Sequence, residues 1–513
     1  MAGFPLEELK EKYRGWKSTP IEVKLISATQ SPYDTSAASA RTCYSSNGLL
    51  LPADMRKSEK SLETARRVAK STLKSGHLTT RQHAHFIFGI TGASRNVIWQ
   101  VFHSHPYYNS EQVSQRYVPI KNDRSWYTLP PELAEHSEIT SFFDNAHRDY
   151  EKLIELLEPR VSEIYFSIHR LKARQPDAHR TDIRKRCMEI ARYVMPLGTN
   201  AYFYHTISAL TLLRYAKMIE HFANPEAAAI ILQMVELVLE IDPDFALELT
   251  EPLPERQLET DPIENHRRNA EFDKAMNGQY ARFVSGPGSI DSILDLAEAA
   301  LGYRPELADL LDSARNSLPG ETLYPVSMDE LSRTLNHLHF TFQKKLSHTA
   351  DSQEQRHRTL PGLRPDLATT LVVKPDYIVP ALLREVPAAG EYFQESMHKT
   401  FSLLEKLYER GISARNLTYL LPNAYPIRFV ESGDLLNFYH KWKARLCYNA
   451  QEEIFYSALD EVRSLQSRYP ELYELLGPPC KVRSHLKPRC PEGDHFCGIK
   501  VWQIPMQEYN RIL

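Results

Sequence analysis

The chain has 513 residues, of which 42% are hydrophobic and 25% charged, and its formal net charge is −3. These values describe a globular protein of about two domains and argue against a disordered or fibrous chain. They provide no overall basic field of the kind that nucleic-acid binders carry. No apolar run could cross a bilayer and the first residues lack a secretory signal, so we expect a cytoplasmic protein without nucleic-acid or membrane partners.

The first half opens with a predicted strand, Val23–Ser27, followed by an Ala-rich helix at Thr35–Ala40. A second predicted strand, His83–Phe88, alternates polar and apolar residues. Farther along, Ala191–Pro196 precedes a predicted helix over Ala209–Phe222. Strands thus come first in this half, and helices follow them.

The second half repeats this order, which predicts an internal duplication because four matches occur in the same sequence. In the fourth of these matches, between Ala191–Pro196 and Ala414–Pro422, Arg192 corresponds to Arg415, and the second copy has two to three extra residues. The segments of the second half that correspond to those of the first are, in order, Ala281–Ser285, Ile293–Ala300, His337–Phe342 and Ala414–Pro422.

A break in the apolar pattern separates the two halves. Between residues 250 and 273, prolines and dense charge interrupt the periodicity. We therefore predict two repeats, at residues 1–255 and 275–513, each with a strand-rich front and a helical rear. Such a segregation of strands and helices is typical of an α+β fold.

One long helix is predicted near the end of the second half, because apolar residues recur at helical spacing from Leu435 to Ile454. Asp434 is a plausible N-terminal cap. Asn437, Lys441 and Arg445 lie on one face of this helix, at i, i+4 and i+8, and could line a pocket. The alternative interpretation is an ordinary amphipathic helix with a polar outer face.

The segment Gln353-Glu354-Gln355-Arg356-His357-Arg358 places two planar cations beside a titratable ring. This arrangement suits a ligand that carries a phosphate or a flavin. A solvated charge cluster is the alternative, since short basic runs usually are that. The position, where a strand gives way to a loop, favours a ligand site.

The spacing from His337-x-x-Phe-Thr-Phe to Gln353-x-x-Arg-His-Arg resembles the flavin-dependent thymidylate synthase family. Ser114-Gln115-Arg116-Tyr117 in the first half is similar to the nucleotide loop of that family. Arg445 with Ala450-Gln451-Glu452-Glu453-Ile454 is similar to its substrate-binding helix. On these motifs the chain is identified as two tandem, partly degenerate copies of this domain.

The resemblance implies an enzyme that converts dUMP to dTMP with reduced FAD. It also implies methylene-tetrahydrofolate as the one-carbon donor and reduced nicotinamide as the hydride donor. The sequence contains no Gly-x-Gly-x-x-Gly loop and no Walker sequence, which is consistent with a flavin site outside the Rossmann fold.

The resemblance also implies a role for individual residues. Arg445 would be catalytic, holding the uracil ring. The predicted flavin-binding residues are His337, Arg356, His357, Arg358 and Asn437, and the predicted substrate-binding residues are Ser114, Arg116, Arg192 and Gln451.

Each repeat departs from the family pattern at different positions. In the second repeat Asp366 occupies the expected serine position. In the first repeat the position of the Arg-His-Arg triplet holds His103-Ser104-His105 if the alignment is anchored on Gln100, or Ser104-His105-Pro106 if it is anchored on Ser114. In the rear helix of the first repeat, Ile219 occupies the position of Arg445. Complementary losses predict a composite site and a homodimer that acts as a pseudo-tetramer. Decay after duplication is the alternative, and it would leave a non-catalytic nucleotide-binding, flavin-binding or scaffold protein.

The six cysteines do not form a disulfide framework. Cys43, Cys187 and Cys447 have apolar neighbours and are expected to be small buried side chains. Cys480, Cys490 and Cys497 cluster in a Pro- and Gly-rich tail that also holds His485 and His495. Three thiols and a histidine could bind zinc, and a loop tail with reduced thiols is the equal alternative.

Overall fold

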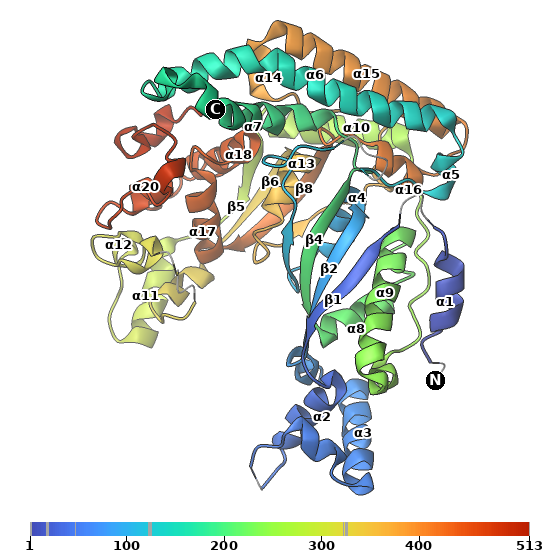
Figure 1. Ribbon diagram of the computed structural model, residues 1–513. Helices are drawn as coiled ribbons and strands as arrows, with labels where there is room; N and C mark the ends of the chain where they lie inside the picture. Colours follow the sequence, from blue (N-terminus) through green and yellow to red (C-terminus); the bar gives the residue numbers. More distant parts are fainter. Residues whose placement is uncertain are drawn as a thin grey trace.

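The computed structural model describes residues 3–16, 20–46, 48–121, 126–321, 323, 327–511 and 513. Two four-stranded sheets lie at its centre, surrounded by helices (Figure 1). Their strand orders are β1-β2-β4-β3 and β5-β6-β8-β7, with every neighbouring pair antiparallel. The equal topology confirms the predicted α+β fold in two tandem copies. Within the described ranges, no helix combines the length and apolarity of a membrane span.

The first repeat is built from four strands and nine α-helices among its described residues. The strands are β1 (Glu22–Ala28), β2 (His85–Ser94), β3 (Asn109–Gln112) and β4 (Asn200–Ser208). The helices are α1 (Leu6–Tyr13), α2 (Pro32–Thr42), α3 (Glu59–Lys74), α4 (Arg95–Val97), α5 (Pro131–Ala134), α6 (Ser137–Ile168), α7 (Arg180–Ala191), α8 (Ala209–Met218) and α9 (Pro225–Ile241).

A linker, residues 249–261, has no helix or strand and leads into the helix α10 (Pro262–Met276). The second repeat begins after α10. Its strands are β5 (Ala281–Ser285), β6 (His339–Ser347), β7 (Gly362–Leu363) and β8 (Pro426–Asp434). Its helices are α11 (Ile290–Leu301), α12 (Leu307–Leu311), α13 (His348–Glu354), α14 (Ala381–Glu385), α15 (Pro387–Glu409), α16 (Ala414–Leu417), α17 (Leu435–Arg445), α18 (Glu452–Arg463), α19 (Pro470–Leu475) and α20 (Pro479–Val482). The proposed limits of the repeats fall within the linker and α10, residue 255 in the linker and residue 275 in α10.

Two sequence predictions about local structure were wrong. Residues Ser332–His337 form a 3₁₀ helix, so His337 precedes β6 instead of opening it. The long helix expected from Leu435 to Ile454 is two helices, because α17 ends at Arg445 and α18 starts at Glu452. The side chain of Gln451 caps α18 by accepting from the backbone N–H of Ile454 at 3.1 Å, which fixes the second start.

Reciprocal backbone hydrogen bonds join the two repeats through matching turns. Leu197 N donates to Leu421 O, and Asn423 N donates to Met195 O, both at 2.8 Å. The outer pair is equally symmetric, since Gly198 N donates to Tyr419 O at 2.8 Å and Ala424 N to Tyr193 O at 2.9 Å. The repeats are therefore related by an approximate twofold arrangement about the turns.

The same pairing corrects one detail of the predicted repeat. Tyr193 donates its hydroxyl to Glu453 at 2.6 Å, and Tyr419 donates to Glu226 at 2.8 Å. These tyrosines are therefore equivalent, and Arg192 corresponds to Thr418 rather than to Arg415. No extra residues separate the two copies here, and the second copy has lost the arginine.

Part of repeat one shares a hydrophobic core with repeat two beneath the long helices. One buried cluster includes Leu153 of α6, Phe393 of α15 and Phe340 of β6, whereas a second covers the first sheet with α8 and α9. Helices α6 and α15 run alongside each other over both sheets (Figure 1). Asp149 joins them by accepting from Tyr392 and Ser396 at 2.7 and 2.6 Å. This shared core holds the repeats in a fixed relation.

Candidate functional site

The Arg356–Arg358 triplet of repeat two lies against β3 of repeat one and the residue before it, Tyr108. Arg356 donates from Nη2 to both carboxylate oxygens of Glu111, at 2.9 and 2.8 Å. The guanidinium of Arg358 is 5.4 Å from the ring centroid of Tyr108. Two arginines of the triplet therefore contact repeat one within the same chain.

His357, between these arginines, is half-buried and its Nε2 atom has no hydrogen-bond partner. Its ring is 6.3 Å from that of His440. Burial, assisted by the positive charge of Arg445, lowers the pKa of His357 well below its ordinary value. The imidazole is therefore neutral near pH 7, and its free nitrogen can form one more hydrogen bond.

Arg445 ends α17 and points back to the start of the triplet. Its Nη2 donates to the carbonyl oxygen of Gln353 at 2.7 Å. Its Nε is 4.0 Å from Glu354 Oε2 and has no hydrogen-bond partner. Burial lowers the pKa of Arg445 although Glu354 opposes the shift, and a guanidinium remains charged under these conditions.

A fully buried cluster of charged side chains lies next to Arg445. Lys344 Nζ is 2.6 Å from Glu461 and 3.3 Å from Glu431. Lys441 Nζ is 2.5 Å from Glu431 and 2.9 Å from Glu461. The cluster contains two lysines and three carboxylates, a formal charge of −1, which Arg445 beside it balances. Its members are Lys344, Glu354, Glu431, Lys441 and Glu461.

These three glutamates are an ion-paired core and not a metal centre. In the part of the chain that the structure describes, they are the one group of three His, Cys, Asp or Glu side chains whose ligand atoms lie within 4.8 Å of one another. Two lysine ammonium groups occupy the space among them. Burial opposes the charge of Lys344, but the carboxylates outweigh it and hold its pKa well above the ordinary value.

Ser114 and Arg116 form a turn after β3. Ser114 Oγ accepts from the backbone N–H of Arg116 at 3.2 Å. The guanidinium of Arg116 reaches repeat two, where Nη2 donates to the carbonyl oxygen of Asn449 at 3.0 Å, and its Nε donates to Glu189 at 2.5 Å. Burial disfavours the charge of Arg116, but Glu189 outweighs it and raises the pKa.

Buried donors without partners lie around this turn. Arg192 donates from Nε to the carbonyl oxygen of Glu189 at 3.2 Å, whereas its Nη2 has no partner. The Nε2 of Gln115 also has none. Unpaired buried donors are costly and rare, so two of them near two arginines indicate a place for an anionic group.

The remaining predicted site residues lie elsewhere or serve the fold. Gln451 is buried and uses its amide N–H to bind the hydroxyl of Tyr193 at 2.6 Å, so both of its polar groups are engaged inside the protein. His337 lines a separate cavity beside residues 285–289. Asn437 lies near the triplet, because its Oδ1 accepts from Thr359 at 2.6 Å. The structure thus gathers Ser114, Arg116, Arg192, Arg356–Arg358, Asn437 and Arg445 around the junction of the repeats, without His337.

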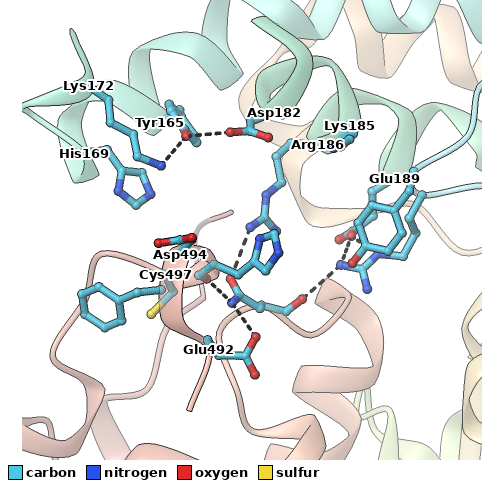
Figure 2. Close-up of a pocket in the computed structure, with 15 residues that line it drawn as sticks. Tyr165, His169, Lys172, Asp182, Lys185, Arg186, Glu189, Glu492, Asp494 and Cys497 are labelled. Carbon is cyan, nitrogen blue, oxygen red and sulfur yellow. Dashed lines mark hydrogen bonds and ion pairs between the residues drawn. The ribbon is translucent and has the colours of Figure 1, made fainter. Parts of the chain in front are cut away.

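A charged cavity of about 490 Å³ opens beside Arg116. In Figure 2, α6 and α7 of repeat one form its upper wall, and the C-terminal tail of repeat two forms its lower wall. Arg186 reaches across the cavity, with Nη2 3.4 Å from Asn449 Oδ1. Sequence reasoning missed this wall, although the basic run Arg184-Lys185-Arg186 signalled it. Its other lining residues with ionisable side chains include His169, Lys172, Asp182, Lys185, Glu189, Glu492, Asp494 and His495.

The twofold-related junction has lost the same charges. Asp366 replaces Ser114 there, and Thr418 replaces Arg192. Ile219 replaces Arg445, because each is the eleventh residue of its segment, counted from Ala209 in α8 and from Leu435 in α17. The linker between the repeats covers the junction. There Arg256 pairs with Asp366, and Glu255 with Arg415 at 3.2 Å.

The interior of repeat one beside this junction is built from neutral rings. The hydroxyl of Tyr215 is 2.7 Å from His105 Nε2 and 3.1 Å from His205 Nε2. The ring of His103 stacks on Tyr108 at 4.7 Å. Burial lowers the pKa of His103 to about 3 and that of His105 to about 4, and it lowers the pKa of His205 well below the ordinary value.

Comparison with known proteins identifies the family. The model of the family described as "Thymidylate synthase complementing protein" matches residues 24–244 and 307–471, more than half of the chain. The chain is 29% identical over 204 residues to a flavin-dependent thymidylate synthase from Clostridium tetani, which covers 39% of this chain and 74% of that protein. It is 26% identical over 168 residues to one from Geobacter sulfurreducens, which covers 32% and 70% respectively.

A solved structure of the UMP/dUMP methylase PolB from Streptomyces cacaoi, bound with 5-Br dUMP, aligns with 45% of this chain and 94% of that chain, at 15% identity and a TM-score of 0.32. The family match is the stronger finding, because its two segments include β2, β3 and β4 of repeat one and β6, β7 and β8 of repeat two. The chain therefore belongs to the flavin-dependent thymidylate synthase family.

Proposed function

We propose that this protein is a flavin-dependent thymidylate synthase that converts dUMP to dTMP at one composite site between its repeats. The convergence of charge at their junction is the observation that supports this best. Arg116 of repeat one binds the carbonyl of Asn449 in repeat two, and Arg356 of repeat two binds Glu111 in repeat one. Family membership supports the chemistry.

In this proposal, Arg116, Arg192 and Ser114 bind the phosphate of dUMP. The unpaired Nη2 of Arg192 and the nearby Gln115 amide are donors that an anion would satisfy. Glu189 fixes Arg116 and remains ionised, because the surrounding arginines outweigh burial and lower its pKa to about 2. A phosphate can therefore use the donors of Arg116 that Glu189 and Asn449 leave open.

Arg445 is the proposed catalytic residue. Its Nη2 is fixed by the carbonyl of Gln353, and its unpaired Nε remains available to the uracil ring. A fixed guanidinium at a pyrimidine carbonyl stabilises the negative charge that develops there when the ring is attacked. The neighbouring ion-paired core holds α17 and keeps this cation in place.

The triplet region fits the flavin. Arg356 and Arg358 offer two cations, and Tyr108 and neutral His357 offer ring surfaces. Arg356 is exposed, and exposed ion pairs contribute only about 0–1 kcal/mol, so a phosphate could replace Glu111 at little cost. Arg356, His357, Arg358 and Asn437 would hold FAD, which supplies the hydride when reduced.

Methylene-tetrahydrofolate as the one-carbon donor and reduced nicotinamide as the hydride donor complete the proposal. The cavity beside Arg116 lies within the usual size range of small-molecule sites. Its lysines and Arg186 suit the anionic part of such a co-substrate. We further propose a homodimer, whose four repeats would reproduce the tetramer that the family resemblance implies.

Flavin binding is tested first by the visible spectrum of the purified protein. We expect a yellow protein, and we expect Arg356→Ala combined with Arg358→Ala to give a folded, colourless one. Because both side chains lie at the surface of the junction, circular dichroism should remain that of the wild type. Full flavin retention in the double variant would remove the triplet from the site.

Nucleotide binding is tested by titrating dUMP while following the flavin spectrum. Arg116→Ala should weaken binding by about ten- to a hundred-fold, the equivalent of about 1.5–3 kcal/mol for a hydrogen bond to a charged group. Arg415→Ala, at the junction covered by the linker, is the matched control and should leave the affinity unchanged. If the wild-type protein binds dUMP but forms no dTMP when the folate and the reduced nicotinamide are also supplied, it is the non-catalytic binding protein of the alternative hypothesis. If it binds no dUMP at all, the proposed function is wrong.

A further inference from the structure

Four of the six cysteines line one small cavity beneath the C-terminal tail. Cys447 comes from the turn after α17, and Cys480 from α20. Cys490 and Cys497 come from the tail itself, which carries only short helical turns. The sequence grouped the last three, whereas Cys447 was expected to be a small buried side chain because its neighbours in the sequence are apolar.

The cavity has the size and the lining of an ion site. The free space at its centre is about 10 Å³, which is room for one water molecule or ion. All four cysteines are free thiols. Neither His485 nor His495 lines this cavity, and His495 lines the neighbouring charged cavity instead.

Backbone amides approach three of the sulfur atoms. The backbone groups of Asn449, Trp502 and Ile499 face the sulfurs of Cys447, Cys480 and Cys497, respectively. Burial raises the pKa of all three thiols, and these backbone groups offset part of that rise. Gly498 makes the last of these turns possible because its φ of +82° is a conformation that favours glycine. Such amide contacts are the outer-shell support that metal-bound ligands usually have.

We infer that Cys447, Cys480, Cys490 and Cys497 bind one zinc ion as a tetrahedral tetrathiolate site. Thiolate ligands select zinc among the abundant divalent ions, and four of them form a closed structural centre. No three of these sulfurs now lie within 4.8 Å of one another. Zn–S bonds of about 2.3 Å would draw them together, and binding would release the thiol protons to solvent. The weak contact from Cys497 Sγ to the carbonyl of Ile499, at 3.5 Å, would be replaced.

The inferred site would fix one wall of the charged cavity. Cys497, Asn449, Glu492 and Phe496 line both the cysteine cavity and the larger cavity beside Arg116. The side-chain amide of Asn449 donates to the backbone carbonyl oxygen of His495 at 2.6 Å, and the backbone carbonyl oxygen of Asn449 accepts from Arg116. An ion held by Cys447 and Cys497 would therefore tie the tail to the turn on which Arg116 rests.

The metal content of the full-length protein tests the inference. We expect protein purified under reducing conditions to contain one zinc per chain by mass spectrometry of the ashed sample. A mercurial reagent should release that zinc as the thiols react. In the cobalt-substituted protein, intense visible bands should indicate a tetrahedral thiolate site.

Variants assign the ligands. Cys490→Ser should lower the bound zinc by about tenfold or more, whereas Cys43→Ser, which alters an exposed cysteine, should leave it at one per chain. If Cys490→Ser fails to fold, Cys490→His retains a ligand and should keep zinc while weakening the cobalt charge-transfer bands.

Three results would overturn the inference: wild type without zinc after reconstitution, zinc retained in full by Cys447→Ser and Cys490→Ser, or disulfides among these four cysteines in freshly purified protein. Each readout is independent of flavin and dUMP binding, so failure here leaves the proposed function untouched.

Discussion

The two junctions between the repeats occupy equivalent places but differ in nearly every charge. At one, Arg116, Arg192 and Arg445 converge beside the triplet that begins with Arg356. At the other, Ile219 and Thr418 replace two of the arginines, and the linker covers what remains through Glu255 and Arg256. One junction gathers cations, two of which keep an unpaired donor, and the linker makes ion pairs across the other.

The interiors beside the junctions differ in the same sense. Repeat two balances Lys344 and Lys441 against three carboxylates, whereas repeat one has Tyr215 and two histidines. Lys441 and Tyr215 are each the seventh residue of their helix, and Glu431 and His205 each lie three residues before a helix cap. One backbone therefore supports either an ionic or a neutral polar core, and only the ionic core lies beside the arginine to which we propose a catalytic role.

The largest expected effect comes from breaking the ionic core. Replacing Lys344 by isoleucine, the type of residue at the matching position 90 of repeat one, leaves carboxylates unpaired in the core. Removing one partner of a buried ion pair costs about 3–5 kcal/mol. Urea unfolding should show a loss of this size.

The matched control is Tyr215→Phe in repeat one, which removes a hydroxyl from between two histidines and should cost about 1–2 kcal/mol. Equal losses in both variants would mean that the two cores are energetically alike.

The second effect concerns acid sensitivity, which we expect to originate in repeat one. His205 is buried as a neutral ring, so its pKa is depressed in the folded protein relative to the unfolded chain. Below the unfolded pKa of about 6.5 the unfolded state binds a proton that the folded state does not, so the stability present above that pH is lost as the pH falls. His205→Phe should therefore reduce the slope of the unfolding free energy against pH by about 1.4 kcal/mol per pH unit.

Denaturant titrations at several pH values measure this slope. His339, an exposed histidine of β6, serves as the control, and His339→Phe should leave the slope unchanged. A wild-type slope in His205→Phe would show that the ring is already protonated in the folded protein.

The smallest effect is expected at the covered junction. Arg256→Ala breaks the ion pair with Asp366, and a partly exposed pair of this kind contributes about 0–1 kcal/mol. The melting temperature should change little, and the chain should still bind one dUMP, because Ile219 and Thr418 provide no cation. Isothermal titration would contradict this if the variant bound two dUMP molecules per chain, and the linker would then be an inhibitory cover.

The fold was largely predictable from sequence because its signals are local. Strand β5 lies at the predicted residues, and β1 extends one residue beyond the prediction at each end. The break between α17 and α18 was missed because apolar spacing continues through it and only the cap formed by Gln451 interrupts the helix. Strands β4 and β8 were not anticipated, since their pairing with β2 and β6 depends on segments far away in the chain.

The site was predictable where a motif carries its own charge. Arg116, Arg356 and Arg445 could be named from sequence, whereas the equivalence of Arg192 and Thr418 required the reciprocal contacts of Tyr193 and Tyr419. Cys43, expected to be buried, is exposed, and Cys447 lies with the tail cysteines. Neither placement follows from neighbours in the sequence, because tertiary packing decides which side of a turn faces the solvent.

The covalent linker has a consequence for how such a protein can change over generations. In an assembly of identical subunits, one codon change alters every equivalent position at once, so a residue needed at one site is protected at all of them. Residues 249–261 join the two copies into a single gene product, in which position 219 and position 445 are inherited separately. Isoleucine at one and arginine at the other are therefore compatible in the same molecule, and the join gives each copy its own evolutionary constraint.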